Sequence, residues 1–389
     1  MREVAIIGAG MVRLGKYDGK PGHLPYKTHE ELGVGACRAA LKHAQVNHRK
    51  IEAVYAGQTA TAQVQLGQRV ADVLGISGIP MYNHENACAT SLAAFRQAYL
   101  DVANGVHDLV LVFGAELMSS MLSGGAIVLP EGAMFLQDVG MIMPVFFALL
   151  AKRHMEEYGT TKEQFAMVSV KNHKHSMANP YAQYQREFTL EEVLNSRMVC
   201  DPITLLQCCP TGDGAAAVIV ASAAVARQYT TKPVRVVGST VHGGEYKASK
   251  GDFTTIGSCT KAAKELYEIT GVGPEDIDVC EQHDCFTPHE LVTYEDLGFC
   301  EKGEGGRFIE DGLSDFGGKC VFNPSGGLQS KGHPIAATGV AQLVELTWQL
   351  RGECGARQVE RAKVGLAHNG GGIGPGLEPG LISLTMLAI

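Results

Sequence analysis

The chain has no excess of positive charge and no long apolar run. Its 389 residues contain 33 Lys and Arg against 41 Asp and Glu, a formal net charge of -8. This balance gives no basic surface for nucleic acid or an anionic membrane, although local Lys and Arg clusters could hold an anionic small molecule. The longest apolar run, Met141 to Ala151, contains Pro144 and is too short to span a bilayer. We expect this run to pack inside a subunit or between subunits.

The sequence also lacks a recognisable leader and the cysteine spacing of a zinc knuckle. Residues 1–8 read as a strand entering a turn, without the basic and apolar blocks of a signal peptide. The eleven cysteines follow no regular spacing, and neither Cys208 with Cys209 nor Cys280 with Cys285 has the two-residue gap of a zinc knuckle. A free reactive thiol is easiest to keep in a reducing compartment. We therefore expect a cytoplasmic protein without a metal site.

The composition indicates a globular α/β protein of more than one unit. Apolar residues make up 45% of the chain and charged residues 19%, and 47 glycines imply many tight turns between strands and helices. A chain of 389 residues exceeds what one hydrophobic core usually serves. Two domains or two fused halves are expected.

The two halves of the chain show the same order of elements. Each half opens with a strand, continues through a helix, a short strand, a second helix and a further strand, and ends with a terminal strand. The matching segments are 4–8 and 234–238, 32–44 and 258–270, 51–57 and 277–282, 88–102 and 337–350, 109–114 and 364–368, and 215–221 and 381–387. This order predicts an α/β fold of two similar βαβαββ halves packed in layers.

One long segment has no counterpart in the second half. Residues 116–195 are Met-rich and then polar, and we expect an inserted loop domain there. The predicted division is an N-terminal half of residues 1–115 and 196–225, the insertion 116–195, and a C-terminal half of residues 226–389. His173 and His175 alternate in the polar part of the insertion, where a solvated loop face is more common than a metal site.

Cys88 stands between a short polar strand, residues 81–85, and a helix rich in small residues. At a helix N-terminus, unpaired backbone N–H groups and the helix dipole lower the pKa of a thiol, which makes it a nucleophile. For any one of eleven cysteines taken alone, a buried structural role would be the commoner case. The repeat favours the nucleophile, because the turn that matches Cys88 is the loop 332–339, and a pseudo-twofold axis would bring the two turns together.

Four turns at the ends of predicted strands are rich in Gly, Cys and His, and open α/β folds bind ligands at such strand ends. The turns are the Cys88 turn, residues 283–286, residues 325–334 and residues 368–374. A thiolate, an imidazole, a second thiol and glycine-rich N–H donors together suit acyl transfer through a thioester.

These motifs resemble those of the thiolase superfamily along nearly the whole chain. The Asn-Ala-Cys-Ala-Thr-Ser element of residues 86–91 resembles the nucleophile motif, with Thr90 where Ser is usual. The Gly-His-Pro loop of residues 332–339 resembles the histidine loop, with Ala336 where Gly is usual. The resemblance implies a thiolase-like fold in which duplicated halves form a layered α-β-α-β-α sandwich.

Two further loops resemble the sterol-carrier-protein and archaeal subtype. His283-Asp284-Cys285-Phe286 replaces the usual Asn-Glu-Ala-Phe loop, and His368 stands where other thiolases carry a second catalytic cysteine. In this subtype Cys285 is implied to be the acid/base thiol. The resemblance also implies a homodimer, coenzyme A as a substrate, and by analogy a small partner subunit with a zinc ribbon and an OB-fold.

The expected reaction is cleavage of a 3-oxoacyl-CoA by CoA, or the reverse Claisen condensation. Cys88 would attack the ketone carbon after giving its proton to His333, and Cys285 would protonate the enolate that leaves. The side chains of His283 and His333 would hold the enolate oxygen.

The tetrahedral adduct would be held by the N–H of Cys88 and that of Gly370 or Gly371. His368 would orient Cys285 or the substrate, or support the glycine turn. The residues expected to contact CoA are Lys247, Ser249, Lys250 and Ser330.

The acyl group and the direction of the reaction are left open by the sequence. Candidate substrates are (S)-2-benzoylsuccinyl-CoA of anaerobic toluene degradation, acetoacetyl-CoA, and branched or steroid side-chain acyl-CoA. A decarboxylating ketosynthase is a second possibility, but Cys285 argues against it because that reaction needs no thiol that works on carbon. A non-catalytic or retro-aldolase subunit is a third, and Cys88 argues against that one.

Overall fold

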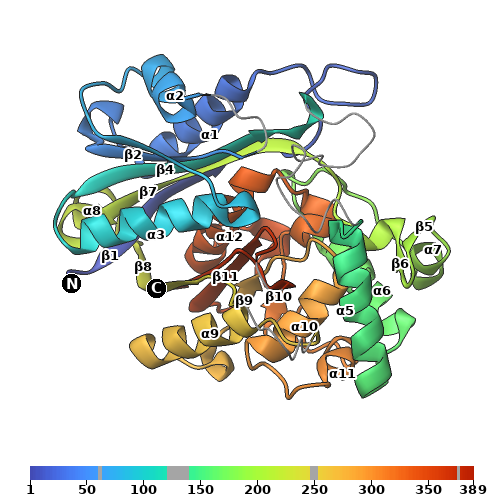
Figure 1. Cartoon of the computed structure of the whole chain (residues 1–389). Coiled ribbons are helices and arrows are strands. Elements are labelled where there is room, and N and C mark those ends of the chain that lie inside the picture. The colour runs from blue at the N-terminus through green and yellow to red at the C-terminus, as the bar shows by residue number, and fades with distance from the viewer. Residues whose placement is uncertain (60–63, 121–139, 246–252, 375–376) are drawn as a thin grey trace.

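A computed structural model of the chain describes residues 1–59, 64–120, 140–245, 253–374 and 377–389. The elements form five layers, with helices outside and between two groups of strands (Figure 1). Each helical layer holds one pair of helices. These pairs are α1 (His29–Ala44) with α2 (Leu66–Leu74), α3 (Thr90–Ala103) with α12 (Thr338–Arg351), and α9 (Gly257–Thr270) with α10 (Thr287–Asp296).

The strands of the two halves follow the same spatial order. That order is β1-β7-β4-β2-β3 in the first half and β8-β12-β11-β9-β10 in the second. Antiparallel pairing of β1 with β8 joins the halves into one hydrogen-bonded sheet of ten strands. The bounds are β1 Val4–Met11, β2 Ala53–Gly57, β3 Met81–His84, β4 Leu109–Leu117, β7 Asp213–Ser222, β8 Val234–His242, β9 Val279–Glu281, β10 Val321–Phe322, β11 Val364–Gly371 and β12 Leu381–Ala388.

The predicted duplication and layered α/β fold are confirmed. In each half a short central strand is parallel to both of its neighbours, β2 to β3 and β4 in one half and β9 to β10 and β11 in the other. The structure adds β10, a strand of two residues that the sequence pattern did not predict. The sequence-based division into 1–115 with 196–225, 116–195 and 226–389 remains a prediction.

The middle helical layer is the core of the molecule. Phe95 of α3 and Val344 of α12 are fully buried among strand residues of both halves, including Val218 and Ala367. A helix between two groups of strands has almost no face toward solvent, so its polar residues need internal partners. Glu345 of α12 meets this requirement by pairing with the Arg357 guanidinium at 2.9 Å.

The segment between β4 and β7 is more regular than predicted. It contains α5 (Met143–Tyr158), α6 (Lys162–Ser176), α7 (Leu190–Leu194) and the short strands β5 (Met198–Cys200) and β6 (Ile203–Thr204). Two further α-helices in the described part of the chain are α8 (Ala223–Tyr229) and α11 (Gly305–Glu310). None of the described helices is both long and apolar enough to cross a membrane.

The prediction of a solvated loop at His173 and His175 was wrong. Both residues lie on α6 and are 3% exposed. His175 is held by the Asn323 carbonyl oxygen at 3.0 Å and the Asp315 carboxylate at 2.8 Å. A helix of low hydrophobicity is buried here because its polar side chains find hydrogen-bond partners, and sequence polarity alone gives no sign of that.

Candidate active site

Cys88 occupies a tight turn between β3 and α3. Residues Ala87–Ala89 form one turn of 3-10 helix, and Ala87 has the left-handed φ of 48°. The Thr90 hydroxyl ties this turn together, because it accepts from the Asn86 N–H at 2.8 Å and donates to the Ala87 carbonyl at 2.6 Å. A left-handed φ at a residue with a side chain is strained and persists only where neighbouring bonds fix it. The turn therefore presents Cys88 in a fixed direction.

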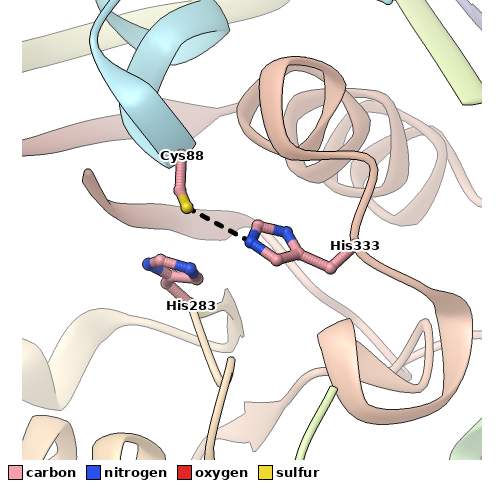
Figure 2. A group of neighbouring side chains, drawn as sticks. All are labelled: Cys88, His283 and His333. Atoms are coloured by element: carbon pink, nitrogen blue, oxygen red, sulfur yellow. Dashed lines mark hydrogen bonds between the residues drawn. The ribbon is translucent and has the colours of Figure 1, made fainter. Parts of the chain in front are cut away.

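His333 lies against Cys88, with its Nε2 3.3 Å from the Cys88 Sγ (Figure 2). The other ring nitrogen, Nδ1, is 2.7 Å from the Thr338 hydroxyl oxygen. That hydroxyl donates its own proton to the Pro334 carbonyl at 3.0 Å, so it must accept from His333. The proton of the neutral imidazole is thereby placed on Nδ1, and the lone pair of Nε2 faces the thiol.

The pair is neutral at rest, which corrects the expected low thiol pKa. Burial raises the pKa of Cys88 to about 12, against the opposing effect of the Gly372 N–H. Burial, with the nearby charge of Lys331, lowers the pKa of His333 to about 3. The loss of solvent around the half-buried thiol outweighs the helix N-terminus. Thiolate therefore forms only as the proton passes to His333.

His283 supplies an N–H that points at no protein acceptor. Its Nδ1 accepts from the Gly370 backbone N–H at 3.0 Å, so the proton of the neutral ring lies on Nε2. That Nε2 is buried and has no hydrogen-bond partner among the described residues. Figure 2 shows the His283 ring beside the Cys88 and His333 pair, and the two imidazole centres are 5.2 Å apart. Burial holds the pKa of His283 well below its usual value, so the ring stays neutral.

Cys285 is brought to the same place from the turn after β9. Its side chain is 4% exposed, and burial raises its pKa well above the usual value, with Cys209 and Cys88 close enough to raise it further. Its Sγ lies 3.6 Å from the Nδ1 of His289 in α10. The Cys209 N–H donates to the Cys285 carbonyl at 2.9 Å. Three thiols, at Cys88, Cys209 and Cys285, thus converge on one site.

His368 supports the turn that carries His283. Its Nδ1 is 3.5 Å from the backbone nitrogen of His283, a weak hydrogen bond, and its carbonyl accepts from the Gln342 amide at 3.0 Å. The ring is fully buried and its centre is 5.7 Å from that of His289. These contacts favour the structural alternative for His368 over an orienting role toward Cys285.

The glycine turn after β11 approaches the backbone of the Cys88 turn. A Cβ on Gly371 would lie 2.1 Å from the Asn86 carbonyl oxygen, so no other residue fits there. The Gly370 N–H is engaged by His283, and the amide that interacts with the Cys88 sulfur is that of Gly372. Sequence reasoning placed the oxyanion donor at Gly370 or Gly371 and did not consider Gly372.

The predicted CoA contacts divide into two groups. Ser330 does not fit its role, because it is fully buried and its hydroxyl contacts the Ser176 hydroxyl at 2.7 Å and the Tyr184 carbonyl at 3.1 Å. Lys247, Ser249 and Lys250 lie outside the described residues.

A buried polar network holds the 283–286 turn in place. The Asp284 carboxylate accepts from the Leu328 N–H at 2.7 Å and from the Asn172 amide at 2.8 Å, and so joins the 283–286 turn to the 327–331 turn and to α6. Burial and the charge of Glu290 raise the pKa of Asp284. Glu290 is itself paired with Lys171 at 2.7 Å. No sequence pattern indicates this network, since its members are far apart along the chain.

Among the residues that the structure describes, two triads have donor atoms close enough to bind a metal ion. They are Cys88, His283 and His333, and Cys285, His283 and His289, with all ligand atoms of each triad within 4.8 Å of one another. A cation at either position would take the lone pair of a thiol or imidazole that acyl transfer needs. The expectation of no metal site stays a prediction.

Comparison with known proteins gives a consistent family. A family model described as "Thiolase, N-terminal domain" matches residues 4–224, and one described as "Thiolase C-terminal domain-like" matches residues 239–376. An acetyl-CoA acetyltransferase of Methanothermobacter thermautotrophicus is 41% identical over 380 residues, which cover 96% of this chain and 97% of that protein. Sterol carrier protein 2 of Bos taurus is 40% identical over 385 residues, covering 94% of this chain and 69% of that protein.

Two further similarities concern proteins whose names mention subunits or complexes. The benzoylsuccinyl-CoA thiolase subunit BbsB of Thauera aromatica is 38% identical over 379 residues, covering 95% of each chain. The solved structure entitled "Ltp2-ChsH2(DUF35) aldolase" has a TM-score of 0.85 and 29% identity, covering 99% of this chain and 97% of that one. The family models span nearly the whole chain, and each of these relatives matches at least 94% of it. The chain is therefore an acyltransferase that belongs to the thiolase family, and it resembles the sterol-carrier-protein type.

Proposed function

We propose that this protein cleaves a 3-oxoacyl-CoA with CoA, or runs the reverse Claisen condensation, through an acyl group carried on Cys88. The observation that carries the proposal is the contact of Cys88 Sγ with His333 Nε2 at 3.3 Å, with the other ring nitrogen held by the Thr338 hydroxyl. A thiol with a base in this geometry is an activated nucleophile. Cys285 and the free Nε2–H of His283 supply the two other groups that carbon–carbon cleavage needs.

In the first step, the Cys88 proton passes to His333 Nε2 as the sulfur attacks the ketone carbon. The oxygen of the tetrahedral adduct becomes negative and needs N–H donors. The N–H groups of Cys88 and Gly372 interact with the sulfur and are our first candidates for this role. Gly370 and Gly371 remain candidates if substrate displaces the Gly370 bond to His283.

In the second step, the bond between the α- and β-carbons breaks and the departing acyl-CoA becomes an enolate. His283 Nε2–H and the newly protonated His333 Nε2 are the donors for the enolate oxygen. One such donor typically lowers a barrier by about 3 kcal/mol. Cys285 gives its proton to the α-carbon and becomes a thiolate. The CoA thiol then loses its proton to Cys285 as its sulfur takes the acyl group from Cys88, and His333 returns its proton to the Cys88 sulfur.

Two other reactions compete with this proposal. A decarboxylating ketosynthase would use Cys88, His283 and His333 but would not need Cys285. An aldol cleavage is supported by the structural similarity to the Ltp2 and ChsH2 aldolase. That reaction forms no acyl-enzyme, however, and would not use the Cys88 and His333 pair.

Three classes of acyl group are candidates. Similarity to BbsB supports (S)-2-benzoylsuccinyl-CoA, and similarity to the archaeal acetyltransferase supports acetoacetyl-CoA. Acyl-CoA with a branched or steroid side chain is the third class. We also propose a partner subunit with a zinc ribbon and an OB-fold. The support is that BbsB is named as a subunit and that the similar aldolase structure is named for two proteins, one of them marked DUF35. We further propose a cytoplasmic homodimer. Its support is β3, the terminal strand of the sheet, where Tyr82 is 42% exposed.

The test is a panel of 3-oxoacyl-CoA substrates incubated with CoA, with and without DUF35-type subunits encoded near the gene. Intact-mass and peptide analysis should locate an acyl group on Cys88 before CoA is added. Cys285→Ala should abolish thiolysis but leave any malonyl decarboxylation, which separates the ketosynthase. Failure to acylate Cys88 with any substrate, partners present, would overturn the proposal.

A further inference from the structure

We propose that His289 accepts the proton of Cys285, so that the site contains a second thiol–imidazole pair dedicated to the α-carbon of the substrate. This inference rests on the proposed function, because it assigns a partner to the thiol that works on carbon. In the proposed mechanism His289 acts through Cys285, as a positioning residue and proton acceptor.

The geometry of the second pair parallels that of the first. Cys285 Sγ and His289 Nδ1 are 3.6 Å apart, against 3.3 Å between Cys88 Sγ and His333 Nε2. Cys285 lies just ahead of α10 and His289 in its first turn, four residues on, which places both on one side of the helix entry. Both side chains are almost fully buried, at 4% and 2% exposed.

Two other bases beside Cys285, His283 and Asp284, are already engaged by other groups. The Nδ1 of His283 is occupied by the Gly370 N–H. The Asp284 carboxylate is occupied by N–H donors of Asn172 and of the 327–331 turn. His289 has only the thiol at Nδ1, and its Nε2 is buried without a partner. The ring is also held in place, since its centre lies 5.1 Å from that of the Phe147 ring, at a tilt, and 5.2 Å from that of His283.

A lone buried thiol is a poor carbon base, which is why a partner matters. Burial raises the pKa of Cys285 well above its usual value and lowers that of His289 to about 3, so both groups are neutral at rest. A buried thiolate without a proton acceptor beside it would be strongly disfavoured. Transfer to an imidazole in contact produces the thiolate only when the substrate is in place, as for Cys88.

The proton balance in the condensation direction is as follows. The Cys285 proton moves to His289 Nδ1, and the Cys285 thiolate removes a proton from the α-carbon of the acyl-CoA, whose C–H electron pair forms the enolate. The enolate carbon attacks the Cys88 thioester, a carbon–carbon bond forms, and the carbon–sulfur bond breaks to release Cys88 as thiolate. Cys285 then passes the proton it took from the α-carbon to the neighbouring Cys88 thiolate and takes back the proton held by His289, so both thiols and both imidazoles return to neutral.

The decisive variant is His289→Asn. The Asn amide occupies the region of Nδ1 and can hydrogen-bond to the thiol, but it cannot take a proton, so packing is preserved and proton transfer is removed. Exchange of the α-hydrogens of acetyl-CoA with D2O, followed by NMR, reports on Cys285, while acylation of Cys88 by the same acetyl-CoA, followed by intact mass, reports on Cys88 and His333. We expect exchange to slow by about 100-fold, the lower end of general acid–base effects, and acylation to stay within about twofold of wild type.

A matched control is His154→Asn, another fully buried histidine, which contacts Thr160 and Glu295 instead of a thiol. It should lower the melting temperature yet leave the ratio of exchange to acylation unchanged. The role of His289 would be refuted if His289→Asn exchanged α-hydrogens at the wild-type rate. It would also be refuted if the rates of exchange and of acylation fell equally in this variant. Failure of the wild-type protein to be acylated by acetyl-CoA or by any other acyl-CoA of the panel, or exchange that persists in Cys285→Ala, would instead count against the proposed function.

Discussion

Thr338→Val tests whether one hydroxyl group fixes the proton of His333. In the structure Thr338 accepts from Nδ1–H at 2.7 Å, which leaves Nε2 free to receive the Cys88 proton. Valine has the same shape but no acceptor, so either Nδ1–H stays buried and unpaired or the proton moves to Nε2, where it blocks the transfer from Cys88. An unpaired buried donor costs about 1–3 kcal/mol. At about 1.4 kcal/mol per tenfold in rate, Cys88 acylation should slow by about 5- to 150-fold.

The assay is rapid-quench mass spectrometry of the acyl-enzyme, with a melting curve for each variant. The control is Thr347→Val, on the same helix, because Thr347 is fully buried and donates to the Leu343 carbonyl at 2.7 Å as Thr338 donates to Pro334. Both variants lose a backbone-directed hydroxyl bond, but only Thr338→Val loses the contact with His333. Acylation by Thr338→Val at the rate of Thr347→Val would refute the tautomer argument.

Three further outcomes follow from the site. Because the pKa of Cys88 is raised to about 12, its thiolate fraction should rise about tenfold per pH unit below that value. Labelling of Cys88 by iodoacetamide should therefore accelerate continuously from about pH 7 to about pH 10. A labelling rate that is constant across that range would indicate a preformed thiolate–imidazolium ion pair. Gly371→Ala places a Cβ 2.1 Å from the Asn86 carbonyl oxygen and should displace the turn that carries Cys88. The rates of Cys88 labelling and of Cys88 acylation should both fall. Wild-type values for both rates would contradict the close approach. Lys171→Met leaves the buried Glu290 carboxylate without its ion-pair partner, so the free energy of unfolding measured in urea should fall by about 3–5 kcal/mol. A decrease of less than about 1 kcal/mol would show that the pair is dispensable for stability.

The architecture and the central pair were predictable from sequence because each depends on local pattern. The repeated order of strands and helices predicted the two halves, and the matching turns at Cys88 and 332–339 predicted a meeting that the structure gives at 3.3 Å. The same reasoning placed Cys285 and His283 at a strand end, where the fold brings them to the site. Family motifs then added the expected roles.

Features that depend on burial were not predictable in this way. The helix position of Cys88 suggested a low pKa, but the solvent excluded by the second half reverses the direction. His289 looks like an ordinary helix residue, since nothing in the sequence tells that its neighbour four residues earlier is enclosed. The same lack of tertiary information made His173 and His175 look solvated and Ser330 look available.

The meeting of Cys88 and His333 across the two halves also bears on how such a site can arise. Related turns, one between β3 and α3 and the other between β10 and α12, face each other about a pseudo-twofold axis. In a dimer of identical single halves, both turns would have to carry the same residues, so any nucleophile would face a copy of itself. Joining the halves in one chain removes that constraint, and one turn becomes the electron-pair donor while its counterpart becomes the proton acceptor. Sequence divergence between the two halves, which a single chain permits, thus allows asymmetric chemistry at a symmetric junction.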